Sequence, residues 1–234
     1  MQHKHVAVVI AMRRELAPLL RERAGQRVDG IEFIELENAV VAVGGIGRVA
    51  AWGAAKAVVA RYKPSTLISA GVVGALSATL KVGEVVRGGE VIDADSGARF
   101  TAVGGDSVIV TVSSVSGPAE KRSLAARYKA DVVDMESSAV AAVAREHGVD
   151  FLAVKAVSDK LDFAMPPVGR FVDADGSFAT ARFAAYIAMR PKWWSVVRQL
   201  ALNSKLASLN LSHEVEHLME VLENTKEMEN VPRT

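Results

Sequence analysis

The sequence has no cysteine among its 234 residues. This absence excludes disulfide bonds, thiolate nucleophiles and thiolate metal sites, and it agrees with the reducing cytoplasm, where we expect the protein. The sequence also lacks an excess of charge, since 28 basic and 27 acidic residues give a net charge of +1. Such a balance is not typical of nucleic-acid-binding proteins. We therefore expect a small, weakly charged partner and no nucleic acid.

No long hydrophobic run begins the chain. Residues 6–11 are apolar but are followed closely by charged residues, without a small-residue cleavage site. The run is too short to span a bilayer, so it indicates a first strand. Half of the residues are hydrophobic. A chain of this length can bury roughly 70–75% of its unfolded surface, which predicts one sizeable core.

Apolar runs alternate with alanine-rich segments along most of the chain. Short β-branched runs predict strands and the alanine-rich segments predict helices, so that strand, helix and strand follow one another as βαβ units with a largely parallel sheet. The expected strands are 6–11, 31–36, 38–43, 65–74, 130–133 and 151–159, and the expected helices are 12–20, 50–62, 119–128, 135–147 and 178–189.

The strand at residues 151–159, FLAVKAVSD, ends in Ser158 and Asp159. Ligands of open α/β sheets bind outside the carboxyl ends of the strands, so this pair is well placed for chemistry. The alternative is an ordinary Ser-Asp turn. Glu15 and Glu136 fall in the first turns of helices, where the helix dipole alone could explain a carboxylate. The βαβ order nevertheless allows Glu136 and Asp159 to face one end of the sheet.

Two glycine-containing turns follow predicted strands. Residues 44–47 precede a helix and could offer backbone amides to an anion, or could serve close helix packing instead. In the second turn, Gly71 and Gly74 are expected to allow a bulge or a close backbone approach.

The C-terminal part differs in composition, so we divide the chain into a catalytic domain, residues 1–189, and a helical extension, residues 190–234. Residues 190–206 carry four basic residues, no acidic residue and the adjacent Trp193 and Trp194. A helix over residues 190–209 could contact a membrane surface peripherally, or could simply cover the core. Beyond Ser212 we expect a last helix and a polar, frayed tail from residue 224.

One motif suggests a metal but is discounted. His213, Glu214 and His217 match the H-E-x-x-H pattern of zinc peptidases. Only 17 residues follow His217, and a catalytic zinc also needs a third ligand and a cleft around the helix. A solvated pair of histidines on a terminal helix is the preferred interpretation, and we expect no metal and no cofactor.

Several short segments together resemble the purine nucleoside phosphorylase superfamily, in particular its methylthioadenosine/S-adenosylhomocysteine nucleosidase branch. They occur in order between residues 6 and 160, and the Met-Glu and Ser-Asp pieces are the specific ones. The segments are Ala11–Glu15, Gly45–Ala51, Lys81–Glu84, Val133–Ser137 and Val157–Asp159. The resemblance implies an α/β fold, a three-layer αβα sandwich with a central mixed β-sheet, and a homodimer or larger homo-oligomer.

The resemblance also implies roles for individual residues. Glu15 would activate the attacking water, and Asp159, helped by Ser158, would protonate the purine leaving group. Met135 and Glu136 would hold the ribose. For this chemistry Asp159 would have to keep its proton until the transition state. Each positioned proton transfer contributes roughly 10²- to 10⁴-fold in rate.

Three departures from the pattern bear on the substrate. Gly71 and Val72 belong to a turn in which an apolar residue replaces the hydroxyl of the nucleosidases, and both are expected at the substrate site. The arginine-bearing phosphate loop of phosphorylases is not evident, although Arg13, Arg14 and Arg48 are nearby bases, so hydrolysis is favoured over phosphorolysis. The segment after Asp159 resembles the hopanoid-associated nucleosidase/phosphorylase branch, whose proposed substrate is adenosylhopane; the residues that carry this resemblance are Pro166, Pro167, Phe171, Gly176 and Arg190–Trp194.

The expected function is therefore N-glycosidic cleavage of a purine nucleoside, with adenine as the base and phosphate as a possible co-substrate. A binding or regulatory module with the same fold is the alternative from another class, because fold alone does not fix function. The presence of all three carboxylates, Glu15, Glu136 and Asp159, argues against that alternative.

Overall fold

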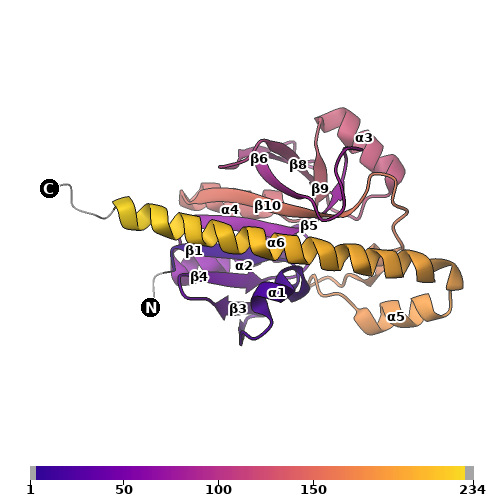
Figure 1. Cartoon of the computed structure of the whole chain (residues 1–234), viewed down its shortest axis with the longest axis horizontal. Helices are drawn as coiled ribbons and strands as arrows, with labels where there is room; N and C mark the ends of the chain where they lie inside the picture. Colours follow the sequence, from indigo (N-terminus) through magenta and orange to yellow (C-terminus); the bar gives the residue numbers. More distant parts are fainter. Residues whose placement is uncertain (1–3, 230–234) are drawn as a thin grey trace.

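The computed structural model describes residues 4–229, which form a ten-stranded mixed sheet covered by helices on both faces (Figure 1). The strands are β1 (Val6–Ile10), β2 (Gln26–Val28), β3 (Ile31–Glu35), β4 (Ala39–Val43), β5 (Thr66–Ala75), β6 (Val85–Asp93), β7 (Arg99–Thr101), β8 (Ser107–Thr111), β9 (Val132–Asp134) and β10 (Asp150–Asp159). The α-helices are α1 (Ala17–Leu20), α2 (Arg48–Tyr62), α3 (Pro118–Tyr128), α4 (Ser137–His147), α5 (Thr180–Ala188) and α6 (Trp194–Glu229), and short 3₁₀ turns are η1 (Arg13–Leu16), η2 (Val168–Phe171) and η3 (Pro191–Trp193).

The long strand β5 is the centre of the sheet. It pairs in parallel with β1 and with β10, and its last two residues pair in antiparallel fashion with β9. Strand β10 also pairs with β6, which leads through β8 to β9. The pairings β10–β6–β8–β9–β5–β10 therefore close into a ring, while β1, β4, β3 and β2 extend the sheet on the other side of β5.

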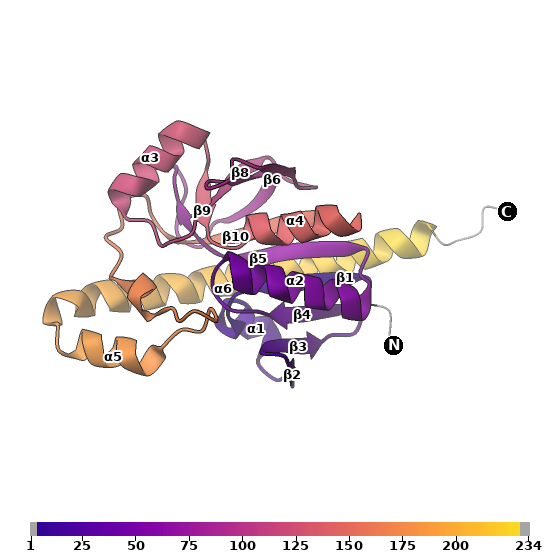
Figure 2. The same ribbon diagram turned by 180° about the vertical axis from the view of Figure 1, so that it is seen from behind.

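Successive residues of the central strands feed opposite faces of the sheet. In β1, Ala7 and Val9 pack in the core beneath α2 and α4, whereas Val6, Val8 and Ile10 pack in the core beneath α6. Figure 2 shows α2 and α4 on the face opposite to α6. The continuous apolar runs thus reflect strands buried on both sides, and the expected three-layer sandwich with a mixed sheet is confirmed.

Most expected elements are present with shifted ends, but the segment 12–20 is not one helix. It forms the 3₁₀ turn η1 followed by the four-residue α1, in which Pro18 occupies the first turn. Proline has no N–H to donate to the carbonyl four residues earlier, so a continuous helix through this point would lose a hydrogen bond. The strand expected at 151–159 is confirmed as β10, and Gly148, with φ of 64°, ends α4.

The two C-terminal helices expected from the sequence are one helix. Helix α6 runs for 36 residues across a face of the sheet (Figure 1). The prediction of a break near residue 210 was wrong, because neither glycine nor proline interrupts this segment. Instead Ala207, Leu211, Val215 and Leu218 lie in the core with β1 and β10. The predicted frayed tail is helical to Glu229, and residues 230–234 lie outside the described residues.

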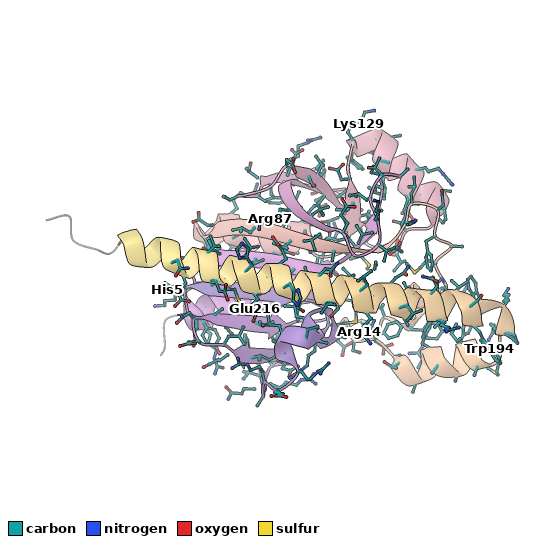
Figure 3. The ribbon with its side chains drawn as sticks, in the orientation of Figure 1. His5, Arg14, Arg87, Lys129, Trp194 and Glu216 are labelled. Carbon is teal, nitrogen blue, oxygen red and sulfur yellow. The ribbon has the colours of Figure 1, made fainter. Side chains whose placement is uncertain are left out.

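The first turns of α6 do not contact the sheet. Trp194 is 55% exposed, and its indole N–H donates to the carbonyl of Ile187 in α5. Figure 3 shows Trp194 at one end of α6, with Glu216 much farther along the helix. Among residues 4–229, no helix is long and apolar enough to cross a membrane. The peripheral contact through residues 190–209 stays a prediction.

Leu211→Ala should reveal how far the sheet depends on α6. Leu211 is fully buried, so its truncation should lower the free energy of unfolding by about 2–5 kcal/mol, as for other leucines removed from packed cores. Leu202→Ala is the matched control, because Leu202 lies on the same helix but is 55% exposed. Urea denaturation measures both variants, and equal losses would contradict this packing.

Candidate active site

The expected carboxylates converge on one cavity at the carboxyl ends of β5, β9 and β10. The cavity has a volume of about 1010 Å³, and Glu15, Glu136 and Asp159 all line it. The parallel strands β5 and β10 bring their carboxyl ends to the same edge of the sheet, which is where α/β proteins bind ligands. Strand β9 runs antiparallel to β5, so the prediction of a parallel βαβ unit through β9, α4 and β10 was wrong, although its carboxyl end still reaches the cavity. The structure therefore joins three residues that are up to 144 positions apart in the sequence.

Glu15 is fixed by backbone amides at the end of β1. Its Oε2 accepts hydrogen bonds from the amides of Ala11 and Met12, both at 2.9 Å, and its Oε1 accepts one from Val72 at 3.3 Å. Burial raises the pKa of Glu15 above its usual value, while these amides and the nearby Lys155 act in the opposite direction. Glu15 is thus a rigidly held carboxylate with an increased affinity for a proton.

Glu136 lies just before α4, at its N-cap, rather than within the first turn as expected. Its Oε1 accepts a hydrogen bond of 2.7 Å from the amide of Gly47, at the start of α2. The glycine turn thus presents an amide to an anion, and that anion is a side chain of the protein. Burial, followed by the Asp134 carboxylate, raises the pKa of Glu136 to about 7, against the lowering effect of Lys155.

Asp159 ends β10 at an irregularity of the sheet. The register between β10 and β5 shifts between Val157 and Asp159, so the predicted bulge is present but lies on β10. Ser158 donates a hydrogen bond of 2.8 Å to Asp159 Oδ1. Lys121 of α3 forms an ion pair with Oδ2, and both side chains are almost completely buried. Asp159 therefore has a cationic neighbour that the sequence did not predict, and its role as the general acid stays a prediction.

A second buried lysine lies beneath the site. Lys155 Nζ is 3.0 Å from Asp134 Oδ2 and donates to Ser69 Oγ at 2.9 Å. Asp134 also accepts hydrogen bonds from Thr111 Oγ1 and from the Ser137 amide. Asp134 therefore binds the first amide of α4, and it also pairs with a charge in the middle of β10.

The remaining predicted substrate-site residues are Met135, Val72 and Gly71, and not all of them line the cavity. Met135 and Val72 line the cavity, but Gly71 does not. A Cβ atom at Gly71 would lie 3.3 Å from Glu15 Oε1. Gly71 therefore leaves room for the Glu15 carboxylate, and its place at the substrate site stays a prediction.

Two of the three nearby arginines are engaged outside the cavity. Arg13 pairs with Glu32, and Arg48 donates a 2.8 Å hydrogen bond to Asp93. Although burial opposes ionisation, hydrogen bonds from Ser96, Arg48 and Ser138 hold the pKa of Asp93 well below its usual range. Arg14 lines the cavity, with its guanidinium 5.5 Å from the centre of the Phe178 ring. Figure 3 shows Arg14 beside α6.

The H-E-x-x-H segment lies on α6, away from the cavity lining. Glu214 forms an ion pair with Arg87, and both His213 and His217 are exposed. Within the described residues, no group of three or more histidine, cysteine, aspartate or glutamate side chains is close enough together to hold a metal ion.

Sequence reasoning missed Lys121 and Lys155. A signal for Lys155 was available, because a lysine inside the apolar run of β10 must find a buried partner. Lys121 lies in the charged segment AEKR, where nothing in the sequence distinguishes it from neighbours that are exposed to solvent. Its role is visible only once α3 is placed against the end of β10.

Comparison with known proteins agrees with this architecture. The family model of the phosphorylase superfamily matches residues 5–111 and 101–188. No curated protein sequence matches the chain.

Solved structures similar to this chain are nucleosidases and a related hydrolase. The 5′-methylthioadenosine nucleosidase of Arabidopsis thaliana has a TM-score of 0.73 and 17% identity, covering 94% of this chain and 96% of its own. The methylthioadenosine/S-adenosylhomocysteine nucleosidase of Colwellia psychrerythraea, in complex with adenine, has a TM-score of 0.70, 18% identity and the same coverage. Futalosine hydrolase of Helicobacter pylori has a TM-score of 0.66 and 18% identity, covering 92% and 98%.

At such identities the structural likeness establishes the fold, and the family model, which matches most of the sequence, establishes the kinship. The chain belongs to the phosphorylase superfamily.

Proposed function

We propose that the protein cleaves the N-glycosidic bond of a purine nucleoside, with adenine as the base and water as the nucleophile. The observation that carries the proposal is the convergence of Glu15, Glu136 and Asp159 on one cavity. Membership of the superfamily supports an enzyme of the nucleosidase or phosphorylase type. The named substrates of the similar nucleosidases support adenine nucleosides in particular.

The three carboxylates address different parts of one barrier. Cleavage builds positive charge on the ribose and negative charge on the departing base. Glu15, held by three amides, is suited to orient a water molecule and accept its proton. Glu136 can accept hydrogen bonds from two neighbouring ribose hydroxyls, with Met135 beside it. Asp159, with Ser158 beside it in the cavity lining, would deliver the proton to the purine.

The arrangement of bases supports water rather than phosphate. A phosphate nucleophile needs cationic donors, preferably arginines that bind its oxygens in pairs. Arg13 and Arg48 are paired with other carboxylates. Of the three arginines expected from the sequence, only Arg14 lines the cavity, together with Arg21 and Lys205.

A second candidate is favoured by the outer wall of the cavity. This wall is formed by apolar side chains of α5 and α6, and the volume of about 1010 Å³ lies at the upper end of the roughly 300–1,000 Å³ usual for small-molecule sites. Leu202, Leu206 and Leu209 line it and are 42–55% exposed. A nucleoside with a bulky apolar 5′ group, as in an adenosylated hopanoid lipid, would fill this space.

Product analysis tests the reaction and the 5′ group together. With methylthioadenosine in phosphate-free buffer, we expect free adenine and a reducing sugar, at a rate that added phosphate does not change. Glu15→Gln should lower this rate by roughly 10²- to 10⁴-fold, while the exposed Glu22→Gln control should not. Formation of a sugar 1-phosphate would contradict hydrolysis. A value of kcat/KM that rises with the length of a 5′-alkylthio chain would favour the second candidate.

The ribose role of Glu136 predicts a pH-dependent preference. Protonation removes an acceptor oxygen, and the pKa of Glu136 is raised to about 7. Hydrogen bonds to a charged group contribute about 1.5–3 kcal/mol. The ratio of kcat/KM for adenosine to that for 2′-deoxyadenosine should therefore fall as the pH decreases below 7, by up to about 10- to 100-fold.

Glu136→Gln should make this ratio small and independent of pH, because the amide does not titrate. Comparing two substrates cancels the titration of Glu15, which affects both. A parental ratio that does not change between pH 8 and pH 5 would be incompatible with the proposed ribose contact.

A further inference from the structure

The roles proposed for the three carboxylates do not use the ion pair between Lys121 and Asp159. Lys121 is 1% exposed and Asp159 is 3% exposed, and both line the cavity. The lysine Nζ also donates a hydrogen bond of 3.0 Å to the carbonyl of Lys160. With Ser158 donating to the other oxygen, both oxygens of Asp159 accept hydrogen bonds.

This arrangement leaves the proposed proton donor without a proton of its own. A carboxylate whose two oxygens accept from an ammonium and a hydroxyl is an acceptor only. The transferable proton of the pair is the one on Lys121. Lysine can release a proton in a desolvated site, in contrast to arginine, which stays charged in proteins.

The strand β5 is shaped to admit the lysine. A Cβ atom at Gly74 would lie 2.8 Å from Lys121 Cε, 2.9 Å from Lys121 Nζ and 3.1 Å from Asp159 Oδ2. The first two of these distances are shorter than real Cβ contacts. The glycine therefore provides the space through which Lys121 reaches Asp159.

We propose that Lys121 holds the proton that the leaving purine receives, and that Asp159 passes it on. The inference rests on the proposed function of the site. Lys121 acts through Asp159 and is therefore a positioning residue that also stores the proton.

In this step the N–H bond of Lys121 breaks and the proton moves to Asp159 Oδ2, which transfers it to N7 of the purine. The electron pair of the bond between C1′ and N9 moves into the purine ring. The water oxygen bonds to C1′, and the water proton moves to Glu15. The lysine is left as a neutral amine and Asp159 as a carboxylate. After product release, Lys121 takes a proton from solvent and Glu15 returns one.

Two substitutions distinguish a proton store from a structural tether. Lys121→Arg keeps the charge that holds Asp159 as a carboxylate but offers no transferable proton. Lys121→Met removes the charge, so the buried Asp159 can take up a proton from solvent and act alone at low pH. We therefore expect kcat on methylthioadenosine to fall at least 10²-fold at every pH in Lys121→Arg. In Lys121→Met it should approach the parental value at acidic pH and decline as the pH rises.

If Lys121 only held Asp159 in place, Lys121→Arg would have the higher kcat of the two variants, because arginine would preserve the ion pair and methionine would not. If kcat of Lys121→Arg on methylthioadenosine equals or exceeds that of Lys121→Met at pH 5.5, the proposal is overturned. The other charged residues lining the cavity are the same in parent and variants, so each variant is compared with the parent at the same pH. They are Arg14, Glu15, Arg21, Asp134, Glu136 and Lys205.

A substrate whose base needs no proton provides the second readout. In an N7-methylated purine nucleoside the base already carries a positive charge before it leaves. Lys121→Arg should lose at most about tenfold in kcat on such a substrate, but at least 10²-fold on methylthioadenosine. Equal losses on both substrates would overturn the proposal.

Controls separate these outcomes from misfolding and from a wrong function. Lys129→Arg and Lys129→Met change an exposed lysine next to the same helix and should match the parent (Figure 3). Gly74→Ala should displace Lys121 without removing it, and should follow the pH profile of Lys121→Met. Circular dichroism verifies that each variant folds. If the parent releases adenine from no nucleoside, the proposed function itself is wrong. If the parent is active but the two Lys121 variants do not show the expected order of kcat, only the proposed role of Lys121 is wrong.

Discussion

The site depends on how the negative charges of its buried carboxylates are stabilised by protein groups that replace water. Glu15, Asp134 and Asp159 are buried at one edge of the sheet, with Glu136 half-buried beside them. Removing a charge from water costs several kcal/mol unless partners replace the lost hydration. Lys155 meets Asp134 beneath the cavity and Lys121 meets Asp159 at its side. These two lysines reduce the free-energy cost of burying several carboxylates close together, so that the protein can fold around them.

The backbone provides the rest of the compensation. Amides of Ala11, Met12 and Val72 bind Glu15, and the Gly47 amide binds Glu136. Fixed amides need no rearrangement when charge develops, which is why preorganised dipoles are effective in catalysis. The two carboxylates with raised pKa values, Glu15 and Glu136, are those held by amides together with a more distant lysine. Among these four carboxylates of the described site, Asp134 and Asp159 are the two in direct contact with an ammonium group.

The sequence predicted the parts of this site that follow from local pattern and a rule of topology. The run at 151–159 predicted β10, and the order of strand, helix and strand predicted that Glu136 and Asp159 would face one end of a parallel sheet. Both residues line the cavity, but β9 runs antiparallel to β5 whereas β10 runs parallel to it, so the predicted parallel unit was wrong. The contact of Lys121 with Asp159 joins residues 38 positions apart and depends on the placement of α3, which no local pattern encodes. The undivided α6 was missed for another reason. The sequence analysis expected two helices, over 190–209 and beyond Ser212, whereas the buried face continues without a break through Leu211 and Val215.

The ring of strand pairings also limits how the sheet can meet other chains. Because β10 pairs with β5 along most of its length and with β6 at Val154–Ala156, neither β5 nor β10 forms an outer edge of the sheet. Within residues 4–229, the outer edges are formed by β2 and β7, each of three residues. Gln26, Arg27, Arg99 and Thr101 are exposed there. Short, polar edges are poor templates for strand addition, so the fold resists edge-to-edge aggregation even though half of its residues are hydrophobic.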